Sequence, residues 1–391
     1  MNNTLNIAKT GPLRGLKVVE FAGLGPAPFC GMLLSDLGAT VLRIDRLGAP
    51  SAGQAMFAPE QDILQRGRQV LALDLKSAEG RAAALRLVSE ADVLIEGFRP
   101  GVMERLGLGP EACLAANPRL VYGRVTGWGQ HGPLAQTAGH DINYLALTGA
   151  LHAIGRREGG PVPPLNLVAD FGGGAMFLAV GVLAALQQAR SSGQGQVVDA
   201  AMTDGVAVLQ AMSLTLHAMG AWTEQRQSNL LDGGAPRYDT YRCVDGEYVA
   251  VGAIEPQFYQ LLLQGLGLAD DPVMQQPDDR ARWPQQRERL TAAFLTRTRD
   301  EWVRQFGVSD ACVSPVLSMT EAAAHPHNQA RGTFVTHRGV LQPAAAPRFS
   351  VTPANPPQDC PGTEPQGDAS LRSWGWSESD IQTLKEHGVL R

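Results

Sequence analysis

Cysteine is scarce in this sequence and is never arranged in close pairs. The 391 residues include five cysteines, with no Cys-x-x-Cys spacing among them: Cys30, Cys113, Cys243, Cys312 and Cys360. Cysteines this sparse exclude a disulfide framework and a zinc site, and they suit a reducing compartment. We therefore expect a cytoplasmic protein without a bound metal.

The sequence also lacks an excess of basic residues and a long apolar run. The formal net charge is −5, so no surplus of cations is available to neutralise the phosphates of a nucleic acid. The longest apolar run, residues 171–186, is shorter than the roughly 20 residues that span a bilayer, and we expect it to form a buried helix. Residues 1–10 are polar and lack the apolar core of a signal peptide. Binding to nucleic acid or membrane is not expected.

What is present is an alternation of strand-like and helix-like segments. Apolar runs predict strands at residues 16–21, 41–45, 70–75, 92–96 and 120–125, and helical patterns between them lie at 28–37, 78–91 and 101–106. This alternation predicts an α/β fold with a doubly wound, mostly parallel sheet. Residues 48–65 break the pattern and are expected to form a mobile loop.

The second half of the chain changes character. Helical patterns at 174–190 and 204–219 flank a short strand at 196–200, and two strand-like runs then flank Asp245-Gly246, a hairpin signal. Helices rich in Arg, Gln and Glu follow over 257–306, and they indicate a smaller α+β domain. Residues 343–367, dense in Pro, Ala and Gly, predict an extended arm that crosses another surface.

The first strand–helix turn resembles a dinucleotide-binding loop, but its chemistry argues against one. Gly23-Leu24-Gly25 follows the first strand, and Asp45 ends the second about 20 residues later. Pro26 and Pro28 remove two backbone N–H groups that would face a pyrophosphate, so NAD binding is not expected.

Arginines at the strand ends favour a phosphate-bearing ligand. Arg43 and Arg46 bracket Asp45, and on spacing alone they fit a solvated strand end as well as a phosphate site. Arg99 follows another strand, and ligands of open α/β sheets bind beyond the carboxyl ends of the strands. Because a guanidinium pairs with phosphate and stacks on a purine, these positions suggest an anion of the adenine-nucleotide type.

Three segments concentrate chemistry-bearing residues: 139–144 with His140, 163–174 with Asp170, and 251–258 with Glu255. Each has a structural alternative, since His140 could pair with Asp141 at the surface and Asp170 or Glu255 could begin a helix. Before the glycines at 172–174, however, Asp170 would stand beside free N–H groups that suit an oxyanion. The histidine would then be a second proton carrier. The residues thus predict an acid–base site without naming its substrate.

At these segments the chain resembles the family III CoA transferases, and within them the α-methylacyl-CoA racemases. The general markers are residues 15–20, Gly23–Pro26, 36–39, 91–96, 169–172 and 330–332; the racemase markers are 139–144, 231–236, 238–241 and 255–259. The resemblance implies a large CoA-binding domain over residues 1–200, completed by 330–391, a linker helix at 201–224 and a small domain at 225–325. It also implies an interlinked homodimer whose active sites are shared between subunits.

The resemblance further implies a role for individual residues. His140 and Asp170 would be the two catalytic bases, and Glu255 of the other subunit would be the partner of His140. CoA would be held by Gly25, Arg46, Leu73, Asp74, Leu75, Lys76, Gly97, Phe98, Arg99, Arg105, Gly139, Asp141, Ile142, Asn143 and Tyr144. The implied reaction is a 1,1-proton transfer on a 2-methylacyl-CoA through an enolate, with no cofactor beyond the CoA moiety of the substrate.

Two rival functions use the same residues. In a CoA transferase, Asp170 would attack the thioester and carry the acyl group as an anhydride; a non-catalytic CoA-binding protein would leave all three side chains without a task. Only the racemase explains His140 and Glu255 together. Arg237, beside Pro236, departs from the racemase pattern, and it would either favour a polar or carboxylated acyl tail or point to solvent.

Overall fold

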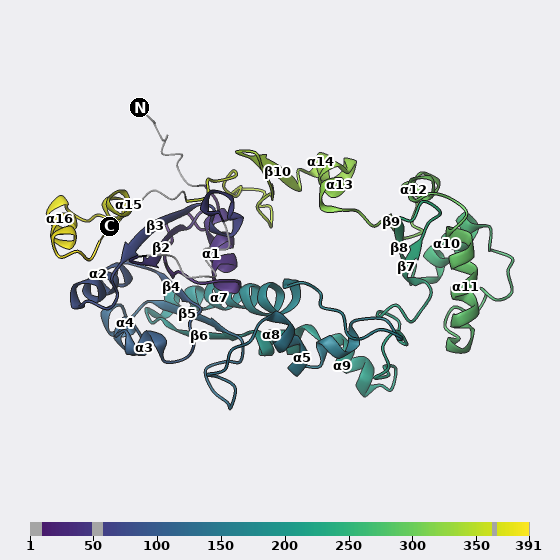
Figure 1. Ribbon diagram of the computed structural model, residues 1–391, viewed down its shortest axis with the longest axis horizontal. Helices are drawn as coiled ribbons and strands as arrows, with labels where there is room; N and C mark the ends of the chain where they lie inside the picture. The colour runs from purple at the N-terminus through teal and green to yellow at the C-terminus, as the bar shows by residue number, and fades with distance from the viewer. Residues whose placement is uncertain (1–9, 49–57, 362–365, 391) are drawn as a thin grey trace. The chain divides into compact units, whose positions relative to one another are not determined.

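The computed structural model describes residues 10–48, 58–361 and 366–390. The chain divides into two compact units (Figure 1). The first comprises Met1–Thr148, Leu165–Leu209 and Gln329–Arg391, and the second comprises Gly149–Pro164 and Gln210–Asn328. Residues 1–9, in the segment expected to lack a signal peptide, and residues 49–57, half of the expected mobile loop, lie outside the described residues. The described end of that loop contains two short 3-10 turns, Pro59–Gln61 and Ile63–Gln65.

A six-stranded parallel sheet forms the centre of the first unit, which confirms the predicted α/β fold. Its strand order is β3-β2-β1-β4-β5-β6, and the strands are β1 (Lys17–Phe21), β2 (Thr40–Arg46), β3 (Arg68–Leu73), β4 (Val93–Glu96), β5 (Val121–Thr126) and β6 (Gln196–Ala201). The order reverses between β1 and β4. In an open parallel sheet this is the point where the loops at the carboxyl ends of the strands diverge and leave a crevice.

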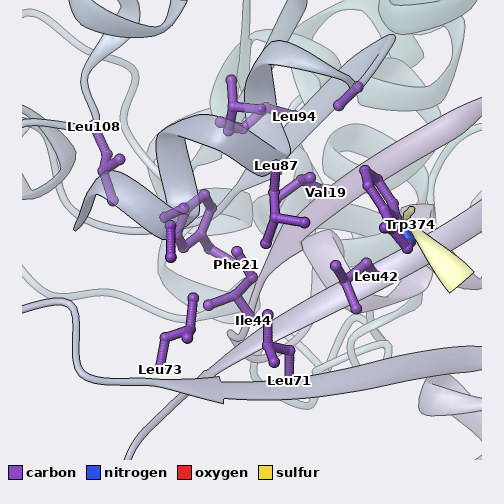
Figure 2. Close-up of a cluster of buried hydrophobic side chains, with 14 of the residues drawn as sticks. Val19, Phe21, Leu42, Ile44, Leu71, Leu73, Leu87, Leu94, Leu108 and Trp374 are labelled. Atoms are coloured by element: carbon purple, nitrogen blue, oxygen red, sulfur yellow. The ribbon is translucent and has the colours of Figure 1, made fainter. Parts of the chain in front are cut away.

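One face of the sheet buries an apolar cluster (Figure 2). Val19, Phe21, Leu42, Ile44 and Leu71 alternate with residues of the opposite face along their strands and are all at most 1% exposed. The helices whose side chains join this cluster are α2 (Ala78–Ser89), α3 (Val102–Arg105), α4 (Pro110–Ala116), α15 (Gly367–Ser373) and α16 (Glu378–Glu386). The C-terminal helices thus complete the core that the N-terminal strands begin.

The opposite face is covered by α1 (Pro26–Asp36) and α7 (Met176–Ser192). On this side Glu20 of β1 and Arg68 of β3 form an ion pair with both side chains fully buried, Arg68 Nε donating to Glu20 Oε2 over 3.0 Å. Arg68 also donates to the carbonyls of Pro28 and Arg66. Burial raises the pKa of Glu20, and the Arg68 charge opposes that rise. The pair fixes β1, α1 and β3 against one another.

Removing one partner of this buried pair should destabilise the first unit strongly. We expect Arg68→Met to lower the free energy of unfolding by about 3–5 kcal/mol, because the Glu20 carboxylate would stay buried without its cation. Chemical denaturation monitored by tryptophan fluorescence measures the change. Arg86→Met is the control: Arg86 pairs with Asp380 at the surface, so its loss should cost less than about 1 kcal/mol. Equal losses for the two variants would contradict the account of the buried pair.

The apolar run expected to form a buried helix behaves differently. It belongs to a continuous 26-residue helix, Leu167–Ser192, and 39% of the most apolar 18-residue stretch of this helix is buried. The helix is long and apolar enough to cross a membrane, but the core helices of some soluble proteins are too. The helix packs on β5, β6 and α1. Met176, Val180 and Leu183 are nevertheless 45, 62 and 38% exposed. The prediction of a buried helix was right for the face that packs on the sheet and wrong for the opposite face, which presents an apolar stripe on the surface of the single chain.

The second unit is built on a three-stranded antiparallel sheet of order β7-β8-β9. The predicted hairpin is present as β7 (Tyr238–Arg242) and β8 (Tyr248–Gly252), and β9 (Val313–Pro315) was not predicted. The core around Phe294 and Trp302 is closed by α10 (Pro256–Leu266), α11 (Trp283–Phe294) and α12 (Arg299–Phe306). The expected linker helix is in fact two helices, α8 (Met202–Leu209) and α9 (Ala211–Ala218), and the boundary between the units falls between them.

The Pro-rich stretch forms the extended arm that the composition predicts. After the hairpin of β10 (Phe334–His337) and β11 (Val340–Pro343), residues 344–361 contain no helix or strand and cross the end of α1. There the Asn355 backbone N–H donates to the Asp36 carbonyl and its side-chain amide to the Ser35 carbonyl, both over 2.8 Å. Residues 362–365, within the predicted arm, lie outside the described residues.

Candidate active site

A cavity of about 380 Å³ lies in the first unit at the point where the strand order reverses. Its walls come from the segments that follow β1, β4 and β5, together with a loop, one helix start and a π-helical segment. The lining residues are Leu24, Gly25, Pro26, Gly97, Phe98, Arg99, Pro100, Val125, Thr126, Gly127, Trp128, Ala135, Thr137, Ala138, Gly139, His140, Tyr144, Asp170 and Met202. The cavity therefore brings together His140, Asp170 and six of the fifteen residues expected to hold CoA: Gly25, Gly97, Phe98, Arg99, Gly139 and Tyr144.

Asp170 faces this cavity from the π-helical segment Leu167–Ala175. A Cβ placed on Gly25 would lie 3.5 Å from Asp170 Oδ2, so glycine at 25 keeps the carboxylate accessible. Partial burial raises the pKa of Asp170, and the neighbouring Asp141 carboxylate raises it further; a hydrogen bond from Asn166 and the His140 charge act in the opposite direction. A carboxyl with a raised pKa in a cavity is suited to carrying a proton.

Asp141 positions Asp170 through the backbone. Asp141 is 5% exposed, and its Oδ2 accepts the backbone N–H groups of Ala169 and Asp170, each over 2.8 Å. Its Oδ1 is buried without a hydrogen-bond partner among the described residues. Asp141 was expected to contact CoA, but it does not line the cavity. Its carboxylate instead fixes the start of the segment that carries Asp170.

Neutralising Asp141 should move the pH dependence of the reaction. In Asp141→Asn the side-chain oxygen can still accept both N–H groups, but the negative charge that raises the pKa of Asp170 is gone. The pKa of Asp170 should then fall, and the carboxylate should stay ionised down to a lower pH. The acidic limb of the pH–rate profile, where Asp170 becomes protonated, should therefore shift to lower pH. The measurement is the pH profile of kcat, in each variant, for the α-proton exchange that the resemblance implies.

The matched control for this shift is Asp199→Asn. Asp199 is another partly buried carboxyl with a raised pKa, and its charge is not among those that act on Asp170. Its neutralisation should leave the acidic limb where it is. A limb that moves upward in Asp141→Asn, or equally in both variants, would contradict the assigned role of Asp141.

The three glycines after Asp170 serve packing rather than ligand approach. A Cβ on Gly173 would lie 2.9 Å from the Val206 backbone nitrogen of α8, and one on Gly174 would lie 2.7 Å from Met202 Cγ. Reciprocally, a Cβ on Gly205 would lie 1.9 Å from the Gly173 carbonyl oxygen. The expectation that Asp170 stands beside free N–H groups was therefore wrong: Gly172–Gly174 let two helical segments touch, and the N–H groups at 169 and 170 are taken by Asp141.

His140 enters the cavity from the start of α5 (Asp141–Leu147) and is exposed. Its backbone N–H donates to Asn143 Oδ1 over 3.0 Å. Asn143, expected to contact CoA, thus caps the helix, and like the exposed Ile142 it does not line the cavity. The histidine and Asp170 are close enough for the His140 charge to lower the Asp170 pKa. The cavity thus holds two different proton carriers.

A loop that the sequence did not single out closes another side of the cavity. Tyr144 Oη donates to the Gly139 carbonyl over 2.5 Å, and its ring packs edge-to-face on Trp128 at 4.8 Å. A Cβ on Gly127 would lie 2.1 Å from that ring, so the contact requires glycine. Burial raises the Tyr144 pKa to about 12, which keeps the phenol protonated. Gly127-Trp128 follows the end of β5, and the strand-end rule that selected Arg99 could have found it.

Exposed cations lie at or beyond the carboxyl ends of three strands of the sheet, β2, β3 and β4. Arg99 lines the cavity, while Arg46 at the end of β2, Lys76 shortly after β3 and Arg105 in α3 are exposed and do not line it. Arg43 does not fit a phosphate site, because it is paired with Asp45 over 2.7 Å and donates to Gln65 Oε1. The structure thus leaves Arg46, Lys76 and Arg105 open to an extended anionic ligand beyond the cavity.

The remaining CoA candidates have structural roles. Leu73 is fully buried, Leu75 packs against the apolar cluster, and the Asp74 backbone N–H donates to the Val389 carbonyl over 3.1 Å. None of these three side chains lines the cavity. The segment after β3 therefore anchors the C-terminal end of the chain.

Glu255 and Arg237 belong to the second unit. Glu255 is exposed at the start of α10, and it is not among the residues that line the cavity of the first unit. Arg237 neither reaches solvent nor lines a described cavity wall: it is 7% exposed, and its Nη2 donates to Asp278 Oδ1 over 2.5 Å. The interpretation that Arg237 points to solvent was wrong, because the side chain turns into its own unit.

The described residues contain no cluster of three or more His, Cys, Asp or Glu side chains that could hold a metal ion. All five cysteines lie within the described ranges, and all have free thiols.

Comparison with known proteins places the chain in one family. Residues 13–366 match the family model described as CoA-transferase family III. The chain is 47% identical to an α-methylacyl-CoA racemase of Mus musculus and 44% identical to one of Homo sapiens, each alignment covering 97% of both chains. Among solved structures it is similar to a CAIB/BAIF family protein from Brucella suis, with a TM-score of 0.77 and 26% identity over 94% of this chain and 100% of the other.

Proposed function

The chain belongs to CoA-transferase family III, and from this premise we propose that it is an isomerase that epimerises 2-methylacyl-CoA thioesters by 1,1-proton transfer. The observation that carries the proposal is the pairing of His140 and Asp170 on one cavity. Two different proton carriers around a single reacting carbon are what inversion at that carbon requires. A transferase of the same family needs only the carboxylate.

The reaction proceeds through an enolate of the thioester. One base removes the α-proton, and the other carrier returns a proton to the opposite face of the planar carbon. Asp170 serves one face and His140 the other, so each direction of the reaction uses one as base and the other as acid. Ionised Asp170 is a stronger base than an ordinary aspartate, because burial and Asp141 raise its pKa.

The CoA moiety is held beyond the cavity by the exposed cations. Arg99 sits at the cavity wall, and Arg46, Lys76 and Arg105, which follow β2, β3 and β4, provide charges for the phosphates. The rest of the CoA moiety contacts the backbone at Gly97 and Gly139 and the aromatic ring of Phe98. The CoA part of the substrate is the only cofactor-like group that the proposal needs.

A homodimer with shared active sites completes the proposal. In the single chain, the first unit exposes large apolar side chains from several elements. Five of them are at least 57% exposed: Leu147, Leu165, Leu167, Val180 and Val208. Patches of this kind mark protein–protein interfaces. Glu255, exposed in the second unit, then reaches His140 of the partner subunit. The free thiols suit the reducing cytoplasm, where we place the enzyme.

Hydroxylamine trapping tests the proposal against the transferase alternative. A transferase forms an acyl anhydride on Asp170, which hydroxylamine converts to a stable hydroxamate. We expect no hydroxamate at Asp170 by mass spectrometry after incubation with a 2-methylacyl-CoA, while a single enantiomer converts to a nearly equal mixture without any free acid. A hydroxamate at Asp170 together with an unchanged enantiomer would establish the transferase instead.

A further inference from the structure

The second unit contains its own cavity, of about 800 Å³, to which the proposed chemistry assigns no task. Its volume falls within the range of about 300–1,000 Å³ that small-molecule sites occupy. The lining residues all belong to that unit: Ile154, Gly155, Arg156, Val162, Asp232, Gly233, Tyr238, Asp239, Thr240, Ala250, Val251, Gly252, Cys312 and Ser314. Most of its walls are apolar, and they include parts of the two racemase-like segments 231–236 and 238–241.

Buried polar contacts make the walls of this cavity rigid. Arg287 donates to the Asp239 carboxylate and, through Nη2, to the Gly233 and Gly234 carbonyls over 2.7 and 2.8 Å. The Asp232 carboxylate is occupied as well, because it accepts backbone N–H groups from Ser228, Asn229 and Gly234. Both carboxylates of the cavity are thus turned toward protein donors.

Arg156 differs from these groups because it has hydrogen-bond donors that remain available to a ligand. It donates to Asp239 Oδ1 over 2.6 Å and to Thr240 Oγ1 over 3.0 Å. Its side chain nevertheless stays 51% exposed. A guanidinium has five N–H donors, so further donors remain for an acceptor in the cavity. The Asp239 charge is shared between Arg156 and Arg287, which leaves this trio with one net positive charge.

The cavity lies close to Glu255 within the same unit. Val251 and Gly252 line it from the end of β8, three to four residues before Glu255. Cys312 lines it too. Burial raises the pKa of that thiol and the Glu255 charge raises it further, so the two side chains are electrostatic neighbours. A substrate whose α-carbon stands beside Glu255 therefore has this cavity within reach of its acyl tail.

We propose that the cavity of the second unit receives the acyl tail of the substrate, and that Arg156 favours 2-methylacyl-CoA esters whose tail ends in a carboxylate. The inference rests on the proposed function, since it takes Glu255 to stand beside the partner's His140 and hence near the α-carbon. The apolar walls bind the methylene chain, and the free guanidinium donors bind the terminal carboxylate. The polar tail once attributed to Arg237 is thereby assigned to a different arginine.

The test compares two substrates of equal chain length, 2-methyldecanoyl-CoA and 2-methyldecanedioyl-CoA with CoA on carbon 1. For each, kcat/KM of α-deuterium exchange is measured in D₂O, and the selectivity is the ratio of the dicarboxylic to the plain substrate. We expect Arg156→Met to lower this ratio about tenfold, as for a lost charge-assisted hydrogen bond at a half-exposed site. Arg156→Lys should retain part of the ratio, because it keeps the charge.

Arg157→Met is the matched control. Arg157 is the adjacent arginine, but it donates to Gln227 and Ser228 and does not line the cavity, so its loss should leave the ratio unchanged. In the wild type, the ratio should also fall with rising ionic strength, which tests the charge without any variant. An unchanged ratio in folded Arg156→Met, or a ratio insensitive to salt, would overturn the tail assignment. Exchange of neither substrate by the wild type would overturn the proposed function itself.

Discussion

Asp170→Asn should abolish net racemisation, lowering the rate by about 10²–10⁴-fold, and His140→Ala should do the same. Each direction of a two-base reaction needs one group to remove the α-proton and the other to return it, so neither group can be dispensed with. Single-enantiomer 2-methylacyl-CoA esters and chiral chromatography measure the loss. The amide of Asp170→Asn replaces the carboxyl at equal size, so a fold-related loss is not expected.

The α-proton exchange that remains in each variant shows which face of the α-carbon each residue serves. Asp170→Asn should retain α-exchange only on the enantiomer that His140 deprotonates, and His140→Ala only on the other one. Deuterium incorporation into each enantiomer, followed separately by mass spectrometry, gives the two rates. Variants that retain exchange on the same enantiomer would refute the assignment of the two residues to opposite faces.

A hybrid dimer should recover about half of the wild-type activity if Glu255 acts on the partner's site. Chains carrying Asp170→Asn and Glu255→Ala are co-expressed with different tags, and the doubly tagged dimer is isolated. With Glu255 acting in trans, one site of each hybrid collects both lesions and the other collects none. Co-expression is needed because interlinked subunits cannot exchange once they have folded.

The homodimers of each variant are the controls for this hybrid. If Glu255 served the site of its own chain, both sites of the hybrid would carry one lesion, and the activity would stay near the mean of the two variant homodimers. That result, with both chains folded, would contradict the shared site. Recovery near one half would place Glu255 beside the partner's His140.

The sheet was predictable because its central strands are buried and rich in valine. Lys17–Phe21 and Val121–Thr126 are buried along almost their whole length, and the alternation of such segments with helices predicts parallel pairing. The edge of the sheet at which ligands bind followed from that topology, which is why Gly25, Arg99 and Asp170 meet at one cavity. The local sequence was thus sufficient to predict the sheet and the edge of the sheet at which the cavity lies.

Side-chain partners were not predictable to the same degree, because they depend on contacts distant in sequence. Asp141 does not line the cavity, and its carboxylate instead accepts the N–H groups of residues 28 and 29 positions later. The glycines at 172–174 have a packing task that appears only when α8 lies against them. Arg237 is held by Asp278, 41 residues away. None of these choices is encoded in the local pattern around each residue.

Deuterium wash-in without an acceptor tests the central claim most directly. Wild-type enzyme is incubated in D₂O with either pure enantiomer of a 2-methylacyl-CoA, without any free acid, and the α-position is followed by NMR and mass spectrometry. A racemase of this design incorporates one deuterium at the α-carbon of each turned-over molecule and brings both enantiomers to the same mixture. An α-position that stays protonated, together with CoA transfer once a free acid is added, would contradict the account.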